Sequence, residues 1–327
     1  MTVIVTGAAG FIGAHVAHRL LDRGEAVVGV DAFSDYYDPA LKVARTRRLE
    51  DRHGFTMARL DIAEAEAFAA LVRETGAKRI VHLAAQAGVR YSIDNPFAYQ
   101  RSNLAGHLSV LEAARHNGVT HLVYASSSSV YGDRPRSLDG GEGAGFKETD
   151  PVDAPVSLYA ATKRADELMS ISYAKLYGFP MSALRFFTVY GPWGRPDMAY
   201  FGFTQKILAG QPIEVYGEGR MARDFTYIDD IVDGIVGVLD HPPASGGHEI
   251  YNIGDNDPVG LMEMITTLET ALGREAVKIM RPMQPGDVTA TYADIDKLNA
   301  LTGYRPKVKL AEGLGRFAAW YRDFYPA

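Results

Sequence analysis

Thr2-Val3-Ile4-Val5-Thr6-Gly7-Ala8-Ala9-Gly10-Phe11-Ile12-Gly13 joins an apolar run to three spaced glycines at the start of the chain. The apolar run predicts a buried strand, and the pattern from residue 11 to about residue 23 predicts a helix. Glycines between a strand and a helix allow a tight turn and let backbone amides approach a pyrophosphate at the positive helix N-terminus. The stretch therefore predicts a dinucleotide-binding turn in which Gly7, Gly10, Phe11, Ile12 and Gly13 contact the cofactor.

An acidic residue ends the second predicted strand, about 20 residues further on, as this kind of turn requires. The carboxylate of Asp31 can accept hydrogen bonds from both ribose hydroxyls and would repel a 2′-phosphate, so NAD is favoured over NADP. The alternative is that the glycines serve packing alone and Asp31 caps a turn. Further cofactor contacts are predicted after the third and fourth strands, at Asp61, Ile62, Ala84, Ala85 and Gln86. For Asp61, helix capping is an almost equal alternative.

The first part of the chain alternates short apolar runs with helical patterns. Strand-like runs fall at residues 3–6, 26–31, 55–61, 79–84, 121–126 and 181–189, and helical patterns at 11–23, 39–51, 64–74, 96–117 and 157–177. Strands without polar alternation, separated by helices, indicate a parallel sheet buried on both faces. We therefore expect an α/β, doubly wound, Rossmann-type domain over residues 1–190. Residues 191–327 should form a smaller α/β substrate lobe, with some segments returning to the first domain.

Charge and composition narrow the class of protein. The net charge is −6, and the densest basic group, Arg45, Arg47 and Arg48, is bracketed by Glu50 and Asp51, so a nucleic-acid partner is not expected. The chain has no cysteine, which removes disulfides, thiolate catalysis and cysteine-ligated metal, and no metal site is expected. No leader segment and no apolar run of membrane-spanning length is visible, so we expect a soluble, cytoplasmic protein without a membrane partner.

A tyrosine and a lysine four residues apart suggest the chemistry. Tyr159 and Lys163 would share one face of a helix, and a nearby ammonium stabilises phenolate relative to phenol. Tyr159 is thus a candidate general base for an alcohol, while Lys163 can also hold the nicotinamide ribose. Ser126–Ser129 end the fifth predicted strand, at the sheet edge where ligands bind. A flexible polar turn is the alternative for one or two of these serines, but not for Ser127.

Five motifs carry a resemblance that covers essentially the whole chain. They are residues 6–13, residues 126–132 ending in Val130-Tyr131-Gly132, the pair Tyr159 and Lys163, residues 185–192 and residues 223–230. In these the chain resembles the extended short-chain dehydrogenase/reductase superfamily, whose members bind NAD tightly and act on nucleotide sugars. Three further stretches, at residues 34–39, 84–90 and 194–199, make it most similar to UDP-glucuronate 4-epimerases.

The resemblance implies roles for several further residues. Ser127 takes the place of a hydroxyl that assists the tyrosine, and Asn103 matches an asparagine of the substrate pocket. Arg223 matches an arginine that faces UDP, with a surface salt bridge as the alternative. Gln284 and Asp287 fall where relatives grip the diphosphate and the ribose, although some epimerases have arginine at the position of Gln284. Relatives also pair two long helices per subunit, so we expect a homodimer formed through residues 96–117 and 157–177. The apolar stripe of Leu104, Leu108 and Leu111 is more often ordinary core.

The predicted activity is NAD-dependent epimerisation of UDP-glucuronate at C4 through a 4-keto sugar, without loss of CO₂. Dehydratases and decarboxylases of the superfamily have an acidic residue where this chain has Ser129, which disfavours both reactions. Ser128, Ser129 and Thr188 are candidates to grip the uronate carboxylate, with Ser127 close by. Arg90 or Arg195 could add charge at the carboxylate or the phosphates. The alternatives are a UDP-glucose/galactose 4-epimerase, a UDP-glucuronate decarboxylase and an idle NAD-binding sensor.

Overall fold

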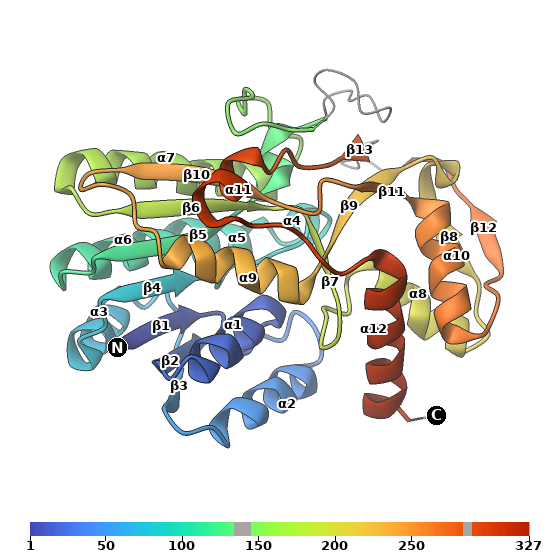
Figure 1. The fold of residues 1–327 in the computed structure, drawn as a ribbon, viewed down its shortest axis with the longest axis horizontal. Coiled ribbons are helices and arrows are strands. Elements are labelled where there is room, and N and C mark those ends of the chain that lie inside the picture. The colour runs from blue at the N-terminus through green and yellow to red at the C-terminus, as the bar shows by residue number, and fades with distance from the viewer. Residues whose placement is uncertain (134–144, 284–289, 327) are drawn as a thin grey trace.

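A parallel sheet of seven strands forms the centre of the larger lobe (Figure 1). The computed structural model describes residues 1–133, 145–283 and 290–326. The strand order is β10-β6-β5-β4-β1-β2-β3. The strands are β1 (Thr2–Thr6), β2 (Ala26–Asp31), β3 (Phe55–Arg59), β4 (Arg79–His82), β5 (His121–Ser127), β6 (Met181–Phe186) and β10 (His248–Ile253). All pairs are parallel, and the chain reverses direction across the sheet between β1 and β4, which confirms the doubly wound prediction.

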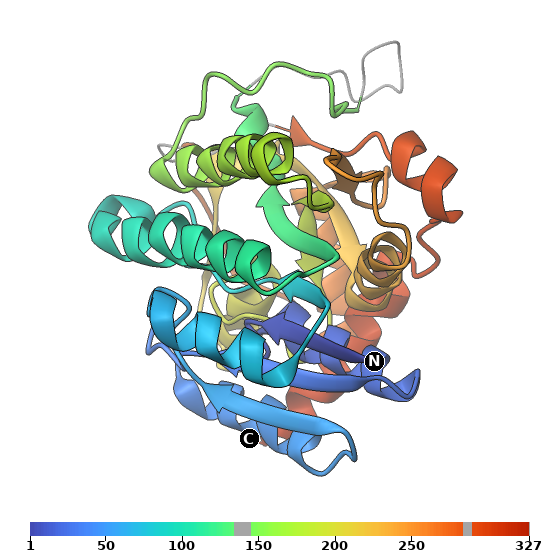
Figure 2. The same ribbon diagram turned by 90° about the vertical axis from the view of Figure 1, so that its left-hand side faces the viewer.

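Helices cover both faces of this sheet (Figure 2). One face carries α3 (Ala65–Thr75), α6 (Gly106–His116) and α7 (Leu158–Tyr177), which pack in that order. The other carries α1 (Phe11–Asp22), α2 (Pro39–Glu50), α9 (Ile228–Leu239) and α11 (Asp296–Thr302). The sheet is therefore buried on both sides, as its apolar strands predict.

Two hydrophobic clusters separate on the two faces of the sheet. Val3 and Val5 belong to one cluster and Ile4 to the other, because successive side chains of a strand point to opposite faces. All three side chains are fully buried. Burial of an aliphatic side chain of this size contributes roughly 1.5–3 kcal/mol, so β1 anchors both layers at once.

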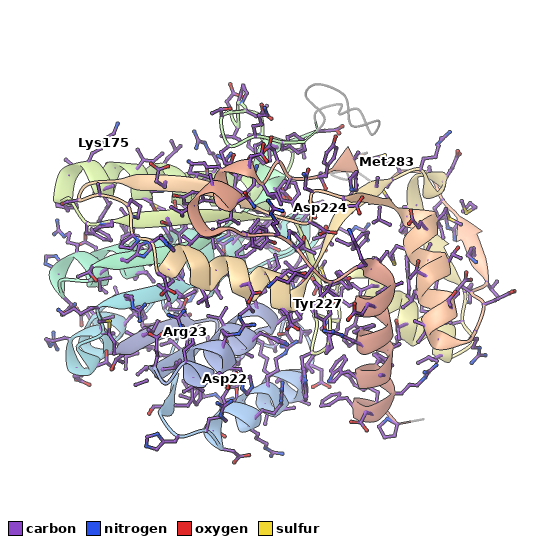
Figure 3. The ribbon with its side chains drawn as sticks, viewed as in Figure 1. Asp22, Arg23, Lys175, Asp224, Tyr227 and Met283 are labelled. Carbon is purple, nitrogen blue, oxygen red and sulfur yellow. The ribbon has the colours of Figure 1, made fainter. Side chains whose placement is uncertain are left out.

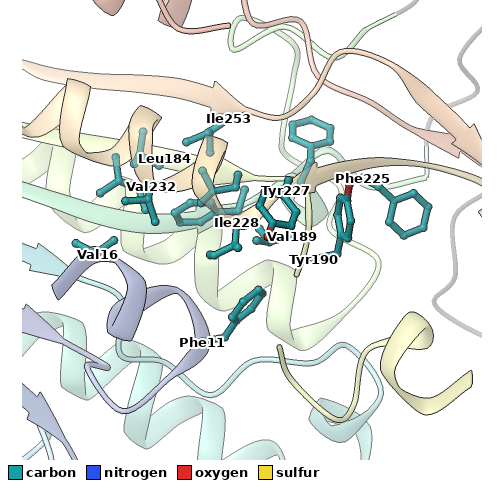
Figure 4. Packing of buried hydrophobic residues seen from close by; sticks show 14 of the residues in the cluster. Phe11, Val16, Leu184, Val189, Tyr190, Phe225, Tyr227, Ile228, Val232 and Ile253 are labelled. Carbon is teal, nitrogen blue, oxygen red and sulfur yellow. The ribbon is translucent and has the colours of Figure 1, made fainter. Parts of the chain in front are cut away.

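A smaller lobe packs against the carboxyl ends of the central strands. It contains α8 (Ala199–Leu208), α10 (Leu261–Leu272) and α12 (Leu310–Phe324), with the parallel pair β8 (Ile213–Val215) and β12 (Lys278–Met280). A second sheet joins β7 (Thr188–Tyr190), β9 (Ala222–Tyr227), β11 (Pro258–Gly260) and β13 (Ala290–Thr291). Figure 4 shows Tyr190, Phe225 and Tyr227 of this sheet gathered beside Ile228, with Phe11 of α1 below them. One continuous apolar cluster thus links the two lobes.

Two predicted elements differ in detail from the structure. The strand predicted at 181–189 is divided at Phe187, because residues 181–186 pair with β10 as β6 and residues 188–190 pair with β9 as β7. The helix predicted at 96–117 is present as three consecutive helical segments, α5 (Pro96–Tyr99), a π-helix (Gln100–Ala105) and α6. The division of the chain at residue 190 stays a prediction, although β10, from the second part, completes the central sheet.

Charged side chains lie mainly at the surface, with a few exceptions in the interior. In Figure 3, Asp22, Arg23 and Lys175 lie on the outside, whereas Asp224 of β9 is fully buried. The remaining short elements are α4 (Tyr91–Asp94) and the 3-10 helices Ser128–Tyr131 and Tyr216–Gly219. Within the described parts of the chain, none of the helices has the length and apolar character needed to cross a membrane.

Candidate active site

A cleft of about 340 Å³ opens where the carboxyl ends of the central strands meet the small lobe. Such an edge is where doubly wound sheets bind ligands. Every residue predicted to contact the cofactor lines this cleft: Gly7, Gly10, Phe11, Ile12, Gly13, Asp31, Asp61, Ile62, Ala84, Ala85, Gln86, Tyr159 and Lys163. The fold thus brings the glycine turn and the tyrosine–lysine pair to one cavity.

The glycine turn is shaped for close approach of backbone to a ligand. Gly7 has a φ of 72°, and a Cβ there would lie 2.9 Å from the amide nitrogen of Ala84. A Cβ on Gly13 would lie 2.1 Å from the carbonyl oxygen of Gly7, so only glycine fits. The N-cap of α1, Gly10, offers no side-chain cap, which leaves amides at the positive end of the helix facing the cleft. These features fit the diphosphate of a dinucleotide.

Asp31 is held rigidly at the end of β2. Its two carboxylate oxygens accept the amides of Ala9 at 3.2 Å and Phe33 at 2.8 Å, and its side chain lines the cleft. Lys42 of α2 also lines the cleft; its ammonium lies 3.7 Å from Asp31 and donates to the hydroxyl of Ser34 at 3.0 Å. Each carboxylate oxygen can still accept a further hydrogen bond. Because Asp31 lines the cleft, a ribose bound there could donate to it.

The position of Asp61 is compatible with both roles considered for it. Its Oδ1 accepts the amide of Ala63 at 2.9 Å, which stabilises the turn before α3, while its Oδ2 accepts from Nε of Arg101 at 2.9 Å. Its side chain also lines the cleft beside Ile62. Asp61 thus makes the turn-stabilising bond and also lines the cleft, while its contact with a cofactor stays a prediction.

The tyrosine and the lysine project from the first turns of α7. Ser157 starts this helix, because its hydroxyl accepts the amide of Ala160 at 3.1 Å. The ammonium of Lys163 is buried and donates to the carbonyl of Ala125 at 3.0 Å and to Asp166 at 3.1 Å. Burial raises the pKa of Asp166 to about 6 even though the adjacent Lys163 ammonium lowers it. Two protein contacts therefore fix the position of the lysine beneath the cleft.

The first two serines of the run line the cleft, whereas Ser128 and Ser129 are not among the lining residues. Ser127 donates to the hydroxyl of Ser129 at 3.1 Å, and Ser126 donates to buried Glu167 at 2.7 Å. Ser128 and Ser129 lie on the 3-10 helix that follows. Thr188 lies between Phe187 and Val189, which both line the cleft.

Asn103 contacts other parts of the protein and is not among the residues that line the cleft, so its predicted place in a substrate pocket stays a prediction. Its Oδ1 accepts the amide of Gln86 at 2.8 Å, and its amide group donates to the carbonyl of Gln86 at 3.1 Å and to Thr162 at 2.9 Å. The side chain is 1% exposed and sits in the π-helix. Its hydrogen bonds hold the segment after β4 against α7, next to the helix turn that carries Tyr159.

The three predicted arginines occupy different surroundings. Arg195 lines the cleft and forms a fork with Asp197; Asp197 is partly desolvated, yet the guanidinium lowers its pKa below the ordinary value. Arg90 lies over the ring of Tyr216 at 5.4 Å, so it contacts the small lobe. Arg223 of β9 donates to the carbonyl of Ala222 at 2.8 Å and is not among the residues that line the cleft. Gln284 and Asp287 lie outside the described residues.

Several residues of the cleft were not assigned a role from sequence. Lys42 is one of them. The sequence feature that could have revealed it is its position on the buried face of α2, which also presents Arg45, Thr46 and Leu49 at helical spacing. Tyr36 and Met198 lie in stretches that carried the resemblance, and the structure adds that both line the cleft.

The fold and this cleft define a Rossmann-type dinucleotide-binding protein with a tyrosine–lysine pair at the ligand edge of its sheet. The chain belongs to the NAD dependent epimerase/dehydratase family, whose model matches residues 3–254. It is 46% identical over 341 residues to the probable UDP-glucuronate 4-epimerase of Rhizobium meliloti, covering 99% of this chain and 98% of that one. It is 45% identical to UDP-glucuronate 4-epimerase 3 of Arabidopsis thaliana over 339 residues, which cover 99% of this chain and 77% of that protein.

A solved structure gives the same assignment. The UDP-glucuronic acid 4-epimerase of Bacillus cereus, in complex with UDP-glucuronic acid and NAD, superposes with a TM-score of 0.91 at 34% identity. The match covers 99% of this chain and 100% of that one. The resemblance inferred from the motifs is therefore confirmed.

Proposed function

We propose that this protein epimerises UDP-glucuronate at C4, giving UDP-galacturonate through a transient 4-keto sugar. The observation that carries the proposal is the meeting of the glycine turn, Asp31, Tyr159 and Lys163 in one cleft. Full-length similarity to UDP-glucuronate 4-epimerases supports the same substrate.

Tyr159 acts as the general base on the C4 hydroxyl. The ammonium of Lys163, anchored by the carbonyl of Ala125, lines the same cleft one helical turn further along α7. Ser127 also lines this cleft, where it can hydrogen-bond the hydroxyl that reacts. NAD, which the turn and Asp31 would hold, supplies a reversible hydride acceptor for C4 when bound.

The uronate carboxylate must be held in a fixed orientation by hydrogen bonds of its own, which we call the carboxylate grip. A ketone at C4 is β to this carboxylate, and a β-keto acid loses CO₂ when the C–C bond aligns with the carbonyl π system. Fixed hydrogen bonds can hold the carboxylate out of that alignment at little cost during the reaction. We assign this grip to Ser128, Ser129 and Thr188, which are sequence neighbours of the cleft-lining residues Ser127, Phe187 and Val189.

The remaining predicted contacts also belong to this proposal. Of the two arginines considered for charge, Arg195 lines the cleft, so we assign it to the substrate, at the carboxylate or the diphosphate. For Arg90, which lies over the ring of Tyr216 of the small lobe, contact with the carboxylate or the diphosphate stays a prediction. UDP contact by Arg223, Gln284 and Asp287 stays a prediction.

Turnover of UDP-glucuronate tests the proposal directly. Incubation with UDP-glucuronate should give UDP-galacturonate by NMR, with little CO₂ release and little conversion of UDP-glucose. Tyr159→Phe should keep bound NAD and lose more than about 100-fold in kcat, because proton transfer by a positioned base contributes roughly that much. Wild-type conversion of UDP-glucose alone, or turnover that persists in Tyr159→Phe, would contradict the assignment.

We also propose that two copies pair through α6 and α7. Leu108 of α6 is exposed, and so are Leu168 and Leu176, which lie two turns apart on α7, whereas Leu111 belongs to the core. Light scattering should give a dimer for the wild-type protein and a monomer for Leu168→Glu; a wild-type monomer would contradict the pairing. A cytoplasmic location stays a prediction.

A further inference from the structure

One arginine of α2 is fully buried and joins three segments that are far apart in the sequence. The guanidinium of Arg45 donates to the carbonyl of Trp193 through Nε at 3.0 Å and through Nη2 at 2.6 Å, and to the carbonyl of Gly194 at 2.9 Å. Its Nη1 donates to the carbonyl of Ala9 at 3.2 Å and to the hydroxyl of Tyr37 at 2.7 Å. These acceptors are all neutral. Burying a cation among neutral groups is unfavourable unless its donors are satisfied, and here each nitrogen has an acceptor.

The segment that Arg45 holds is strained. Trp193 has a φ of 62°, a left-handed conformation that costs a non-glycine residue of order 1–3 kcal/mol. Such a conformation persists only when its surroundings fix it. The indole is enclosed by the guanidinium carbon of Arg48 at 4.6 Å and by the rings of Trp320 at 5.3 Å and Phe324 at 4.9 Å. The bonds from Arg45 to the Trp193 carbonyl fix the backbone itself.

The next residues after this strained turn reach the cleft. Arg195 directly follows Gly194, lines the cleft and pairs with Asp197. Asp197 also accepts the hydroxyl of Tyr36 at 3.1 Å. Tyr36 and Tyr37 are adjacent in the sequence. The segment that they form therefore contacts Asp197 through Tyr36, and it is joined to the strained turn at Trp193 through Tyr37 and Arg45.

We propose that Arg45 is a positioning residue that presents Arg195 to the substrate. It holds Trp193 and Gly194 in the backbone conformation that directs Arg195 into the cleft. It ties that conformation to Ala9 of the glycine turn, so the cofactor turn and the substrate arginine are held in fixed relative positions. This inference rests on the proposed function, in which Arg195 contacts the substrate.

A double-mutant cycle measures the coupling between the two arginines. Arg45→Met keeps an apolar chain of similar reach and removes every donor. We expect a 10- to 100-fold loss of kcat/KM for UDP-glucuronate, roughly the effect of a misplaced positioning group. Arg195→Met should lose a similar factor, and the double variant should be no worse than Arg195→Met alone. Losses that multiply would overturn the proposal, because independent groups contribute additively to the free energy.

Tryptophan fluorescence gives a readout that does not depend on turnover. The chain has two tryptophans, Trp193 and Trp320, and both lie in this cluster. In Arg45→Met the emission should shift to longer wavelength as the turn opens to water. Arg47→Met is the matched control, because Arg47 is an exposed residue of the same helix, and it should change neither emission nor kcat/KM. Unchanged emission in Arg45→Met would overturn the proposal.

A milder variant covers the case in which Arg45→Met does not fold. Tyr37→Phe removes one acceptor of the guanidinium and keeps the ring. It should lower kcat/KM several-fold, and this loss should vanish when Arg195 is already methionine. A loss that persists in the Arg195→Met background would overturn the coupling. Absence of epimerisation by the wild-type protein would count against the proposed function, whereas multiplying losses in an active enzyme would count against the role of Arg45.

Discussion

Glu167→Gln should destabilise the fold severely, because Glu167 neutralises a buried arginine under the active site. Its carboxylate accepts from Nε of Arg185 at 2.8 Å, from Nη2 of Arg185 at 2.9 Å and from Ser126 at 2.7 Å. The Glu167 side chain is fully buried and that of Arg185 is 1% exposed. Removing one partner of such a pair leaves an uncompensated buried charge, which costs about 3–5 kcal/mol.

The glutamine also replaces an acceptor with an amide donor that faces a guanidinium, so the two charge-assisted bonds cannot both survive. We therefore expect the unfolding free energy to fall by about 3–5 kcal/mol, which moves the urea midpoint down by roughly 1 M or more. Unfolding is followed by circular dichroism and tryptophan fluorescence. Glu66→Gln, at an exposed position on α3, is the control and should change the unfolding free energy by less than about 0.5 kcal/mol.

The pH dependence of the unfolding free energy gives a second measurement of the Glu167–Arg185 pair. Although burial acts in the opposite direction, the Arg185 guanidinium holds the pKa of Glu167 below its ordinary value. A lowered folded-state pKa means that the stabilisation is present above the ordinary pKa and is lost as the pH falls below it. The difference in unfolding free energy between the wild-type protein and Glu167→Gln should therefore become smaller at low pH. A loss under about 1 kcal/mol at neutral pH would refute this account.

Three further variants test other parts of the structure. Gly13→Ala puts a Cβ 2.1 Å from the carbonyl oxygen of Gly7 and should weaken NAD binding about 10- to 100-fold, measured by titration of the apoprotein; wild-type affinity would contradict the close approach. Burial, with Asp224 nearby, raises the pKa of Asp255 to about 7. The contribution of Asp255 to the unfolding free energy is therefore complete below about pH 4 and is lost as the pH rises through 7. Asp255→Asn should reduce that fall in unfolding free energy by roughly 1–2 kcal/mol, allowing for partial exposure, and an unchanged pH dependence would argue against the shift. Thr188→Val should raise the fraction of UDP-pentose and CO₂ among the products, and an unchanged ratio would remove Thr188 from the carboxylate grip.

The strands and the central site were predictable because their signals are local. A strand buried on both faces leaves a continuous apolar run, and Ile4 between Val3 and Val5 is such a run. Tyr159 and Lys163 are four residues apart on one helix, so helical geometry alone places them together.

The parts that were missed depend on contacts between distant segments. From the sequence, Arg45 was interpreted only as a member of a small basic group. Nothing in its own helix indicates that it donates hydrogen bonds to carbonyls of a loop about 150 residues further on. The protein contacts of Asn103 with Gln86 and Thr162 were also not visible in its motif, because both partners are distant in the sequence. The strand predicted at 181–189 divides at Phe187 because its two parts pair with different strands, β10 and β9, which only the folded protein defines. The missed arginine, the contacts of Asn103 and the division of the strand share this origin.

The position of β10 at the edge of the central sheet affects how the chain is made. During synthesis β6 leaves the ribosome well before His248–Ile253, so its outer edge lacks a hydrogen-bonding neighbour while the small lobe is still being translated. An open strand edge is a site for pairing with other nascent chains. A gene cut after residue 190 would leave that edge exposed permanently, and its product should aggregate rather than yield an isolated cofactor-binding half.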